Sequence, residues 1–100
     1  MVDDAPENRL GEAVLEFEWD KAKRKDNNKK HGIDFARARR VFLDPDALVM
    51  EASHKSEERL LIVGRMEALL ITVVFTMRGQ RIRIISARHA RRSERKRYGQ

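Results

Sequence analysis

One histidine and two arginines are the residues of this chain best suited to proton transfer and phosphate binding. His31 ends a basic segment, and histidine is the side chain that most readily exchanges protons near neutral pH. Arg83 and Arg88 lie close together, and a guanidinium fork binds phosphate through two hydrogen bonds at once. His31 also has a structural alternative, because a histidine can cap the last carbonyls of a helix.

Three further residues are candidates, each with a structural alternative. His54 and Glu58 lie around a polar loop, where either side chain can act as a base and Glu58 can orient a histidine. The alternative is an ordinary solvated loop, which we favour for His54. Tyr98 can stack on a base or donate a proton, but we favour the alternative that it anchors the last helix to the sheet.

The composition excludes several kinds of chemistry. The chain has 100 residues and no cysteine, which excludes disulfides, thiolate zinc sites and a thiol nucleophile. The histidines at 31, 54 and 89 lack the spacing of metal ligands on one helix, and we predict neither a metal nor a cofactor. No apolar run is long enough to span a membrane, and the first residues lack the pattern of a secretory signal. We expect a cytoplasmic protein.

Positive charge is concentrated in two parts of the chain. The net charge is +6, yet residues 21–40 hold nine bases and two acids, which sum to +7. Residues 81–100 hold eight bases and one acid, which also sum to +7. Concentrated positive charge favours a polyanion or an acidic protein as the partner, the alternative being a solvated basic surface.

The first segments predict an extension followed by a strand. Residues 1–14 are acidic and show no period, so we expect a flexible extension outside a domain formed by residues 15–98. Apolar and acidic residues then alternate, which predicts a strand with Leu15, Phe17 and Trp19 on its buried face.

Cap residues predict where the helices begin and end. Asp20 is a good N-cap and Gly32 a good C-terminal stop for a helix over Lys21–His31. This segment has almost no apolar side chain, so the helix must lie on the surface. A second helix is expected to begin after Asp34 and to end at Asp44-Pro45, because the residue before a proline avoids the helical region. The apolar residues that it buries are Phe35, Ala38, Val41 and Phe42.

The remaining segments are rich in Leu, Ile and Val and predict strands. The expected strands are Ala47–Glu51, Arg59–Gly64, Leu69–Met77 and Arg81–Ala87, followed by a basic helix over Arg88–Tyr98. Turns near Arg65–Ala68 and Arg78–Gln80 are short enough to force antiparallel hairpins. The order β-α-α-β-β-β-β-α predicts an α+β domain, in which one mixed antiparallel sheet has helices on one face.

The other face of this sheet is expected to be half-polar and suited to RNA. It is expected to carry Arg81 and Arg83 beside Thr72 and Thr76. Arg83 and Arg88 differ in parity, so they face one site only if a bulge or the strand end intervenes. We expect Arg88 to meet this condition at the junction with the last helix, where both arginines would meet His31.

Six segments, in their order and spacing, resemble the BrnT toxin family. They are Phe17–Asp20, Lys23 with Asn27 and Lys30–Gly32, Val41–Pro45, His54–Arg59, Val73–Arg78, and Ile82–Arg88 with Ala90, Glu94 and Tyr98. The resemblance covers about residues 15–98. It implies a RelE-like fold and a ribonuclease toxin of a type II toxin–antitoxin pair. The implied partner is a BrnA antitoxin, a ribbon-helix-helix protein that forms a hetero-oligomer with the toxin and represses their operon.

RNA cleavage of the kind that the resemblance implies proceeds by attack of a ribose 2′-hydroxyl on the adjacent phosphorus. It needs a base, cations and an acid. The catalytic candidates are His31, Glu58, Arg83, Arg88 and Tyr98. The RNA-binding candidates are Lys23, Lys30, Arg59, Arg78, Arg81, Arg91, Arg92 and Arg95. A nucleic-acid-binding module without catalysis and a protein-interaction domain are the alternatives.

Overall fold

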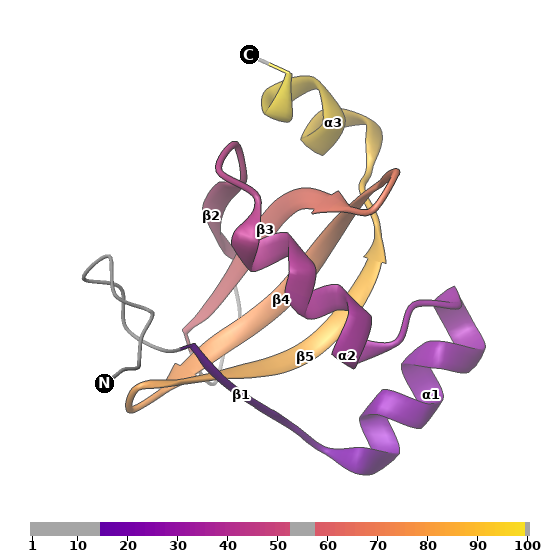
Figure 1. Cartoon of the computed structure of the whole chain (residues 1–100), viewed down its shortest axis with the longest axis vertical. Coiled ribbons are helices and arrows are strands. Elements are labelled where there is room, and N and C mark those ends of the chain that lie inside the picture. Colours follow the sequence, from indigo (N-terminus) through magenta and orange to yellow (C-terminus); the bar gives the residue numbers. More distant parts are fainter. Residues whose placement is uncertain (1–14, 53–57, 100) are drawn as a thin grey trace, which may run out of the picture.

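The computed structural model describes residues 15–52 and 58–99, which build one sheet and its helices (Figure 1). The elements are β1 (Glu16–Trp19), α1 (Lys21–His31), α2 (Phe35–Ala38), the 3-10 helix η2 (Arg39–Leu43), β2 (Leu48–Ala52), β3 (Arg59–Met66), β4 (Leu69–Arg78), β5 (Arg81–His89) and α3 (Arg92–Tyr98). This order confirms the predicted α+β architecture. Residues 1–14 and His54 lie outside the described residues. No helix in the described part of the chain is long and apolar enough to cross a membrane.

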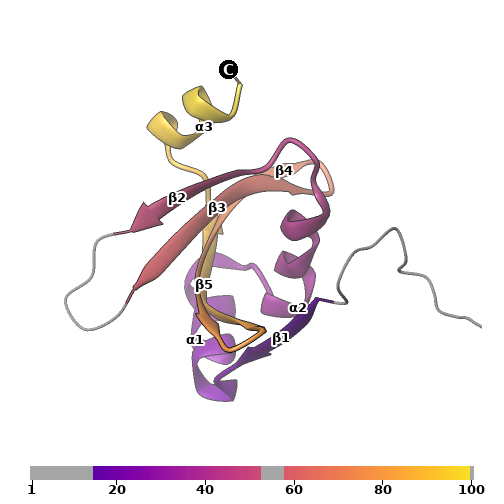
Figure 2. The ribbon, with the colours of Figure 1, turned by 90° about the vertical axis from the view of Figure 1, so that its left-hand side faces the viewer.

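The sheet has the strand order β1-β5-β4-β3-β2. β1 runs parallel to β5, and the other neighbouring strands are antiparallel. α2 and η2 lie across one face, whereas α3 lies at one end of the sheet on its other side (Figure 2). We call the face opposite α2 and η2 the open face. α1 and α3 lie at opposite ends of the molecule (Figure 1).

The core lies between the sheet and the helices α2 and η2. Phe35, Ala38 and Val41 are buried there, as their helical spacing predicts. The strand residues Phe17 and Trp19 pack against this core, but Leu15 is 45% exposed, contrary to prediction. Strand pairing begins only at Glu16, so nothing in the ladder holds Leu15 against the core.

β3 and β5 continue beyond their predicted ends. β3 runs through Gly64 to Met66, because Gly64 pairs with β4 and accepts the close approach of Val41. A Cβ at this glycine would lie 2.5 Å from Val41 Cγ2. β5 runs to His89, so Arg88 lies in the strand and the helix begins only at Arg92. Pairing with β4 holds these last strand residues, and a basic run carries no apolar pattern that would reveal it.

Candidate functional site

A bulge in β5 puts Arg83 and Arg88 on the same face of the sheet. The ladder with β4 shifts by one residue, which leaves Ile85 as the extra residue. Arg83 is therefore opposite Thr76 and Arg88 is opposite Thr72. The two threonines are four residues apart on the open face of β4, so both arginines point to that face as well. The sequence required either a bulge or the strand end to put Arg83 and Arg88 on one face, and the structure shows the bulge.

Arg83 is oriented by a carboxylate from β1. The parallel pairing places Glu18 beside Arg83, and Arg83 Nη1 donates to Glu18 Oε2 at 2.9 Å. The Arg83 guanidinium holds the pKa of Glu18 below its usual value, although burial opposes this effect. The Arg83 side chain is still 29% exposed. It is thus held in position and remains accessible from solvent, and the sequence predicted Arg83 but not its partner.

Arg88 has a different environment, in a buried network that ties β5 to α3. Arg88 Nη1 and Nη2 donate to the two oxygens of Glu94, each at 2.9 Å. Thr72 Oγ1 and the Arg91 backbone N–H also donate to Glu94, at 2.9 and 2.7 Å. These bonds, with the Arg88 bond the strongest cause, lower the pKa of Glu94 to about 2 in spite of its burial. Both terminal nitrogens of Arg88 are thereby occupied.

The distance along the sheet also separates Arg88 from Arg83. Their partners on β4 are four residues apart, which corresponds to about 13 Å along a strand. The two guanidinium groups are also bonded to different carboxylates, Arg83 to Glu18 and Arg88 to Glu94. The structure therefore does not bring Arg83 and Arg88 together at one site, although both lie on the open face.

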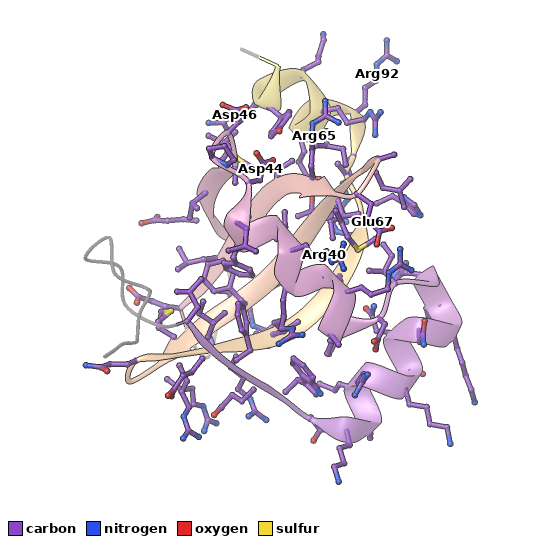
Figure 3. The ribbon with its side chains drawn as sticks, in the orientation of Figure 1. Arg40, Asp44, Asp46, Arg65, Glu67 and Arg92 are labelled. Carbon is purple, nitrogen blue, oxygen red and sulfur yellow. The ribbon has the colours of Figure 1, made fainter. Side chains whose placement is uncertain are left out.

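Tyr98 lies at the same end of the sheet as Arg88. Its hydroxyl donates to Asp44 Oδ2 at 2.7 Å, and the Arg65 backbone N–H donates to the same oxygen at 2.8 Å. Burial raises the pKa of Asp44, but the bonds from Tyr98, Asp46 and Arg65 together hold it below its usual value. Asp44 in turn raises the pKa of Tyr98. Asp44 and Arg65 lie below α3 (Figure 3), and this arrangement favours the anchoring role for Tyr98.

A single buried asparagine holds α1 against the sheet. Asn27 Nδ2 donates to the carbonyls of Ala87 and Ile33, each at 2.9 Å, and the Ala87 N–H donates to Asn27 Oδ1 at 3.1 Å. β1 pairs with β5 only as far as Ile84. Beyond that point the Asn27 amide takes the place of a neighbouring strand and hydrogen-bonds to the backbone of Ala87. In the sequence Asn27 contributed only to the family resemblance, because a polar residue in a polar helix gives no other signal.

A second contact fixes the turn between α1 and α2. Arg24 donates to the two oxygens of Asp34, at 2.6 and 3.0 Å, and its guanidinium lies 5.4 Å from the Trp19 ring centroid. Asp34 precedes α2 as predicted, but its carboxylate makes no side-chain cap. The Arg24 bond lowers the pKa of Asp34. α1 is thus held by polar contacts in place of an apolar face.

A cavity of about 230 Å³ lies between α1 and the bulge of β5. Its helix side is formed by Lys23, Asp26, Asn27, Lys30 and His31. Its strand side is formed by Ile85 and Ser86. Ser86 lies two ladder positions from Arg83, which corresponds to about 7 Å along the sheet. The first basic block therefore does meet β5, at Ser86.

The other predicted residues fall at the two ends of the sheet. Glu58 precedes β3, and its carbonyl accepts a hydrogen bond from Thr76 Oγ1 at 2.7 Å, near Arg83. Arg59 begins β3, and Arg78 and Arg81 flank the β4–β5 turn. Around α3, at the far end, lie Arg91, Arg92 and Arg95. Over residues 15–52 and 58–99, no three His, Asp or Glu side chains are grouped so that they could hold a metal ion.

Comparison with protein families finds a match that covers most of the described chain. The model of a family described as "Ribonuclease toxin, BrnT, of type II toxin-antitoxin system" matches residues 19–94. The matched range begins at Trp19 in β1 and ends at Glu94 in α3, so it includes the Asn27 contact, the cavity and the bulge. No curated protein matches the chain.

Proposed function

Because the chain belongs to the BrnT family of ribonuclease toxins, we propose that it cleaves RNA without a metal ion, at the part of the open face between Arg83 and α1. One observation carries this placement. The β5 bulge puts Arg83 and Ser86 on one face, and Ser86 in turn lines the cavity that contains His31. Arg83 on β5 thus lies two ladder positions from a cavity that is also lined by His31, a proton-transfer group at the end of α1.

The proposed reaction is an attack of the ribose 2′-oxygen on the adjacent phosphorus. The 2′-oxygen forms a bond to phosphorus as the bond to the 5′-oxygen breaks, which leaves a 2′,3′-cyclic phosphate and a 5′-hydroxyl. Arg83, oriented by Glu18, stabilises the negative charge that builds up on the phosphate oxygens. His31 and Glu58 are the candidates for the base that takes the 2′ proton and the acid that protonates the 5′-oxygen.

The structure supports different roles for the other two catalytic candidates. Arg88 and Tyr98 each bond to a carboxylate of a neighbouring element, Glu94 and Asp44. We assign them to holding α3 on the sheet. Arg59, Arg78 and Arg81 are grouped at the end of the sheet where Arg83 lies, and we propose that they contact the RNA backbone there.

A type II toxin has a protein antitoxin, and we propose a BrnA-like ribbon-helix-helix protein in this role. With it the toxin would form a hetero-oligomer that binds the operator DNA through the antitoxin. Neutralisation then requires the antitoxin to cover the open face at Arg83. The α3 arginines Arg91, Arg92 and Arg95 lie at the other end and remain available for a second contact with the antitoxin.

Cleavage by Arg83→Ala tests the assignment. The purified chain is incubated with structured RNA in EDTA, and the antitoxin is then added. We expect cleavage in EDTA, its arrest by the antitoxin, and a rate about 10²- to 10³-fold lower in Arg83→Ala, since one charge-stabilising donor is lost. Arg40→Ala removes an exposed arginine on the helix side and serves as the control. Full activity of a folded Arg83→Ala would refute the site, and absence of cleavage at every concentration would refute the activity.

A further inference from the structure

The cavity between α1 and the β5 bulge contains donors without partners. Asn27 is already bonded to the backbone, because its Nδ2 donates two hydrogen bonds and its Oδ1 accepts one. Among the residues that the structure describes, the Ser86 hydroxyl, the His31 ring and the Lys23 amine contact no acceptor, although all three line the cavity. Lys23 and His31 are exposed and Ser86 is half-buried, so all three donors are free to bind a ligand that carries several acceptor oxygens.

The charge around the cavity favours an anion. Lys23 and Lys30 contribute two positive charges, and Asp26 contributes one negative charge. Lys30 bonds to Asp26 at 3.2 Å, but both side chains are more than half exposed, so this pair is weak and can exchange for a stronger acceptor. His31 adds a further positive charge when it is protonated. The cavity is therefore cationic, and Asp26, the one acid among its described lining residues, is already paired with Lys30.

The lysines of α1 are divided between two faces. Lys23, Asn27 and Lys30 recur at i, i+4 and i+7, so they share the face that meets β5. Lys25 and Lys29 lie on the opposite face and line no part of the cavity. The helix thus offers two pairs of lysines with equal charge in different surroundings.

We propose that this cavity is a phosphate-binding site, formed by Lys23, Lys30, His31 and Ser86. Lysine amines, a ring N–H and a hydroxyl are donors that together suit the several oxygens of a phosphate group. Two sources offer this chemistry, the backbone of an RNA and a terminal phosphate. Only the identification of the ligand as RNA rests on the proposed function, because phosphate binding itself requires no cleavage.

Phosphate binding is measured with the full chain, by NMR titration with inorganic phosphate. We expect shifts at His31 and Ser86, and an affinity about tenfold or more lower in the double variant Lys23→Ala/Lys30→Ala, since each lysine loses a charged hydrogen bond. The variant Lys25→Ala/Lys29→Ala loses the same charge, and its affinity should change less than about twofold. Because neither pair anchors α1, circular dichroism should show both variants folded.

An equal loss in the two lysine variants, or shifts that leave out His31 and Ser86, would overturn the site, since either result means diffuse attraction to α1. Competition by a 2′-O-methyl RNA with a free 3′-hydroxyl identifies backbone phosphate as the source. Competition only by the same oligonucleotide with a 3′-phosphate identifies a terminal phosphate. These oligonucleotides cannot be cut, so their binding is measured independently of cleavage. A chain that binds phosphate but does not cleave ordinary RNA would refute the proposed function and leave the phosphate site standing.

Discussion

Arg83 and Arg88 are chemically the same, but their carboxylate partners give them different roles. Glu18 holds Arg83 at a site open to solvent, whereas Glu94 occupies Arg88 in a buried network. The sequence indicated both arginines as phosphate ligands, because the guanidinium group is recognisable without its surroundings. The sequence could not reveal that the Arg88 guanidinium bonds to Glu94, six residues later. The predicted helix placed both residues in one basic run, where no such contact is apparent.

The Glu94 network predicts a pH-dependent contribution to stability. Glu94→Gln should lower the free energy of unfolding by about 3 kcal/mol at neutral pH, because it breaks a buried ion pair. The pKa of Glu94 is about 2 in the folded chain, whereas its ordinary value, expected in the unfolded chain, is 4.5. As the pH falls, Glu94 is therefore protonated in the unfolded chain before it is protonated in the folded chain. The difference between wild type and variant should thus be complete above pH 4.5 and shrink towards about pH 2.

Urea unfolding at a series of pH values measures this difference. Glu67→Gln is the control, because Glu67 pairs with Arg37 at an exposed site and should contribute less than about 1 kcal/mol. A difference for Glu94→Gln that stays constant down to pH 2 would show that the carboxylate charge does not stabilise the network.

α1 shows which parts of an element the sequence can predict. Its bounds, Lys21–His31, were predicted correctly, because Asp20 and Gly32 act on the backbone beside them. Its docking was not predicted, because Asn27 bonds to Ala87, 60 residues later. The sequence indicated a bulge only as one of two ways to put Arg83 and Arg88 on the same face. Its position at Ile85 could not be predicted, because it depends on how β5 pairs with β4.

Removal of the Asn27 side chain should detach α1. Asn27→Ala leaves the Ala87 N–H and carbonyl without protein partners, and the free energy of unfolding should fall by about 2 to 4 kcal/mol. Amide exchange in α1 should then be faster than in β4. Asn28→Ala alters the exposed neighbour and should change the stability by less than about 0.5 kcal/mol. Equal effects of the two substitutions would mean that helix propensity, and not docking, sets the stability of α1.

The whole molecule carries its two basic blocks in a different arrangement from the one expected. β5 lies beside α1, but α3 lies at the opposite end, so the second block is divided between the two ends (Figure 1). The sequence shows how much charge each segment has, but the direction of α3 depends on contacts such as Tyr98 with Asp44. A short RNA at the α1 end therefore should not reach α3.

The salt dependence of RNA binding tests this separation. With a short 2′-O-methyl RNA, Lys23→Ala/Lys30→Ala should reduce the slope of log K against log salt by about 1.4, as expected for two lost contacts with a single strand. Lys96→Ala/Arg97→Ala removes the same charge from α3 and should leave the slope unchanged. An equal reduction in both variants would show that the RNA spans the two ends.

The contact between Asn27 and Ala87 also fixes when the site can form during synthesis. Glu18 and Asn27 leave the ribosome long before Arg83 and Ala87, from which they are 65 and 60 residues distant. Until β5 emerges, α1 has no strand edge to bind and Glu18 has no arginine to orient. A nascent chain is therefore without its site while most of its own message is being read, and a chain that stops before β5 lacks it altogether.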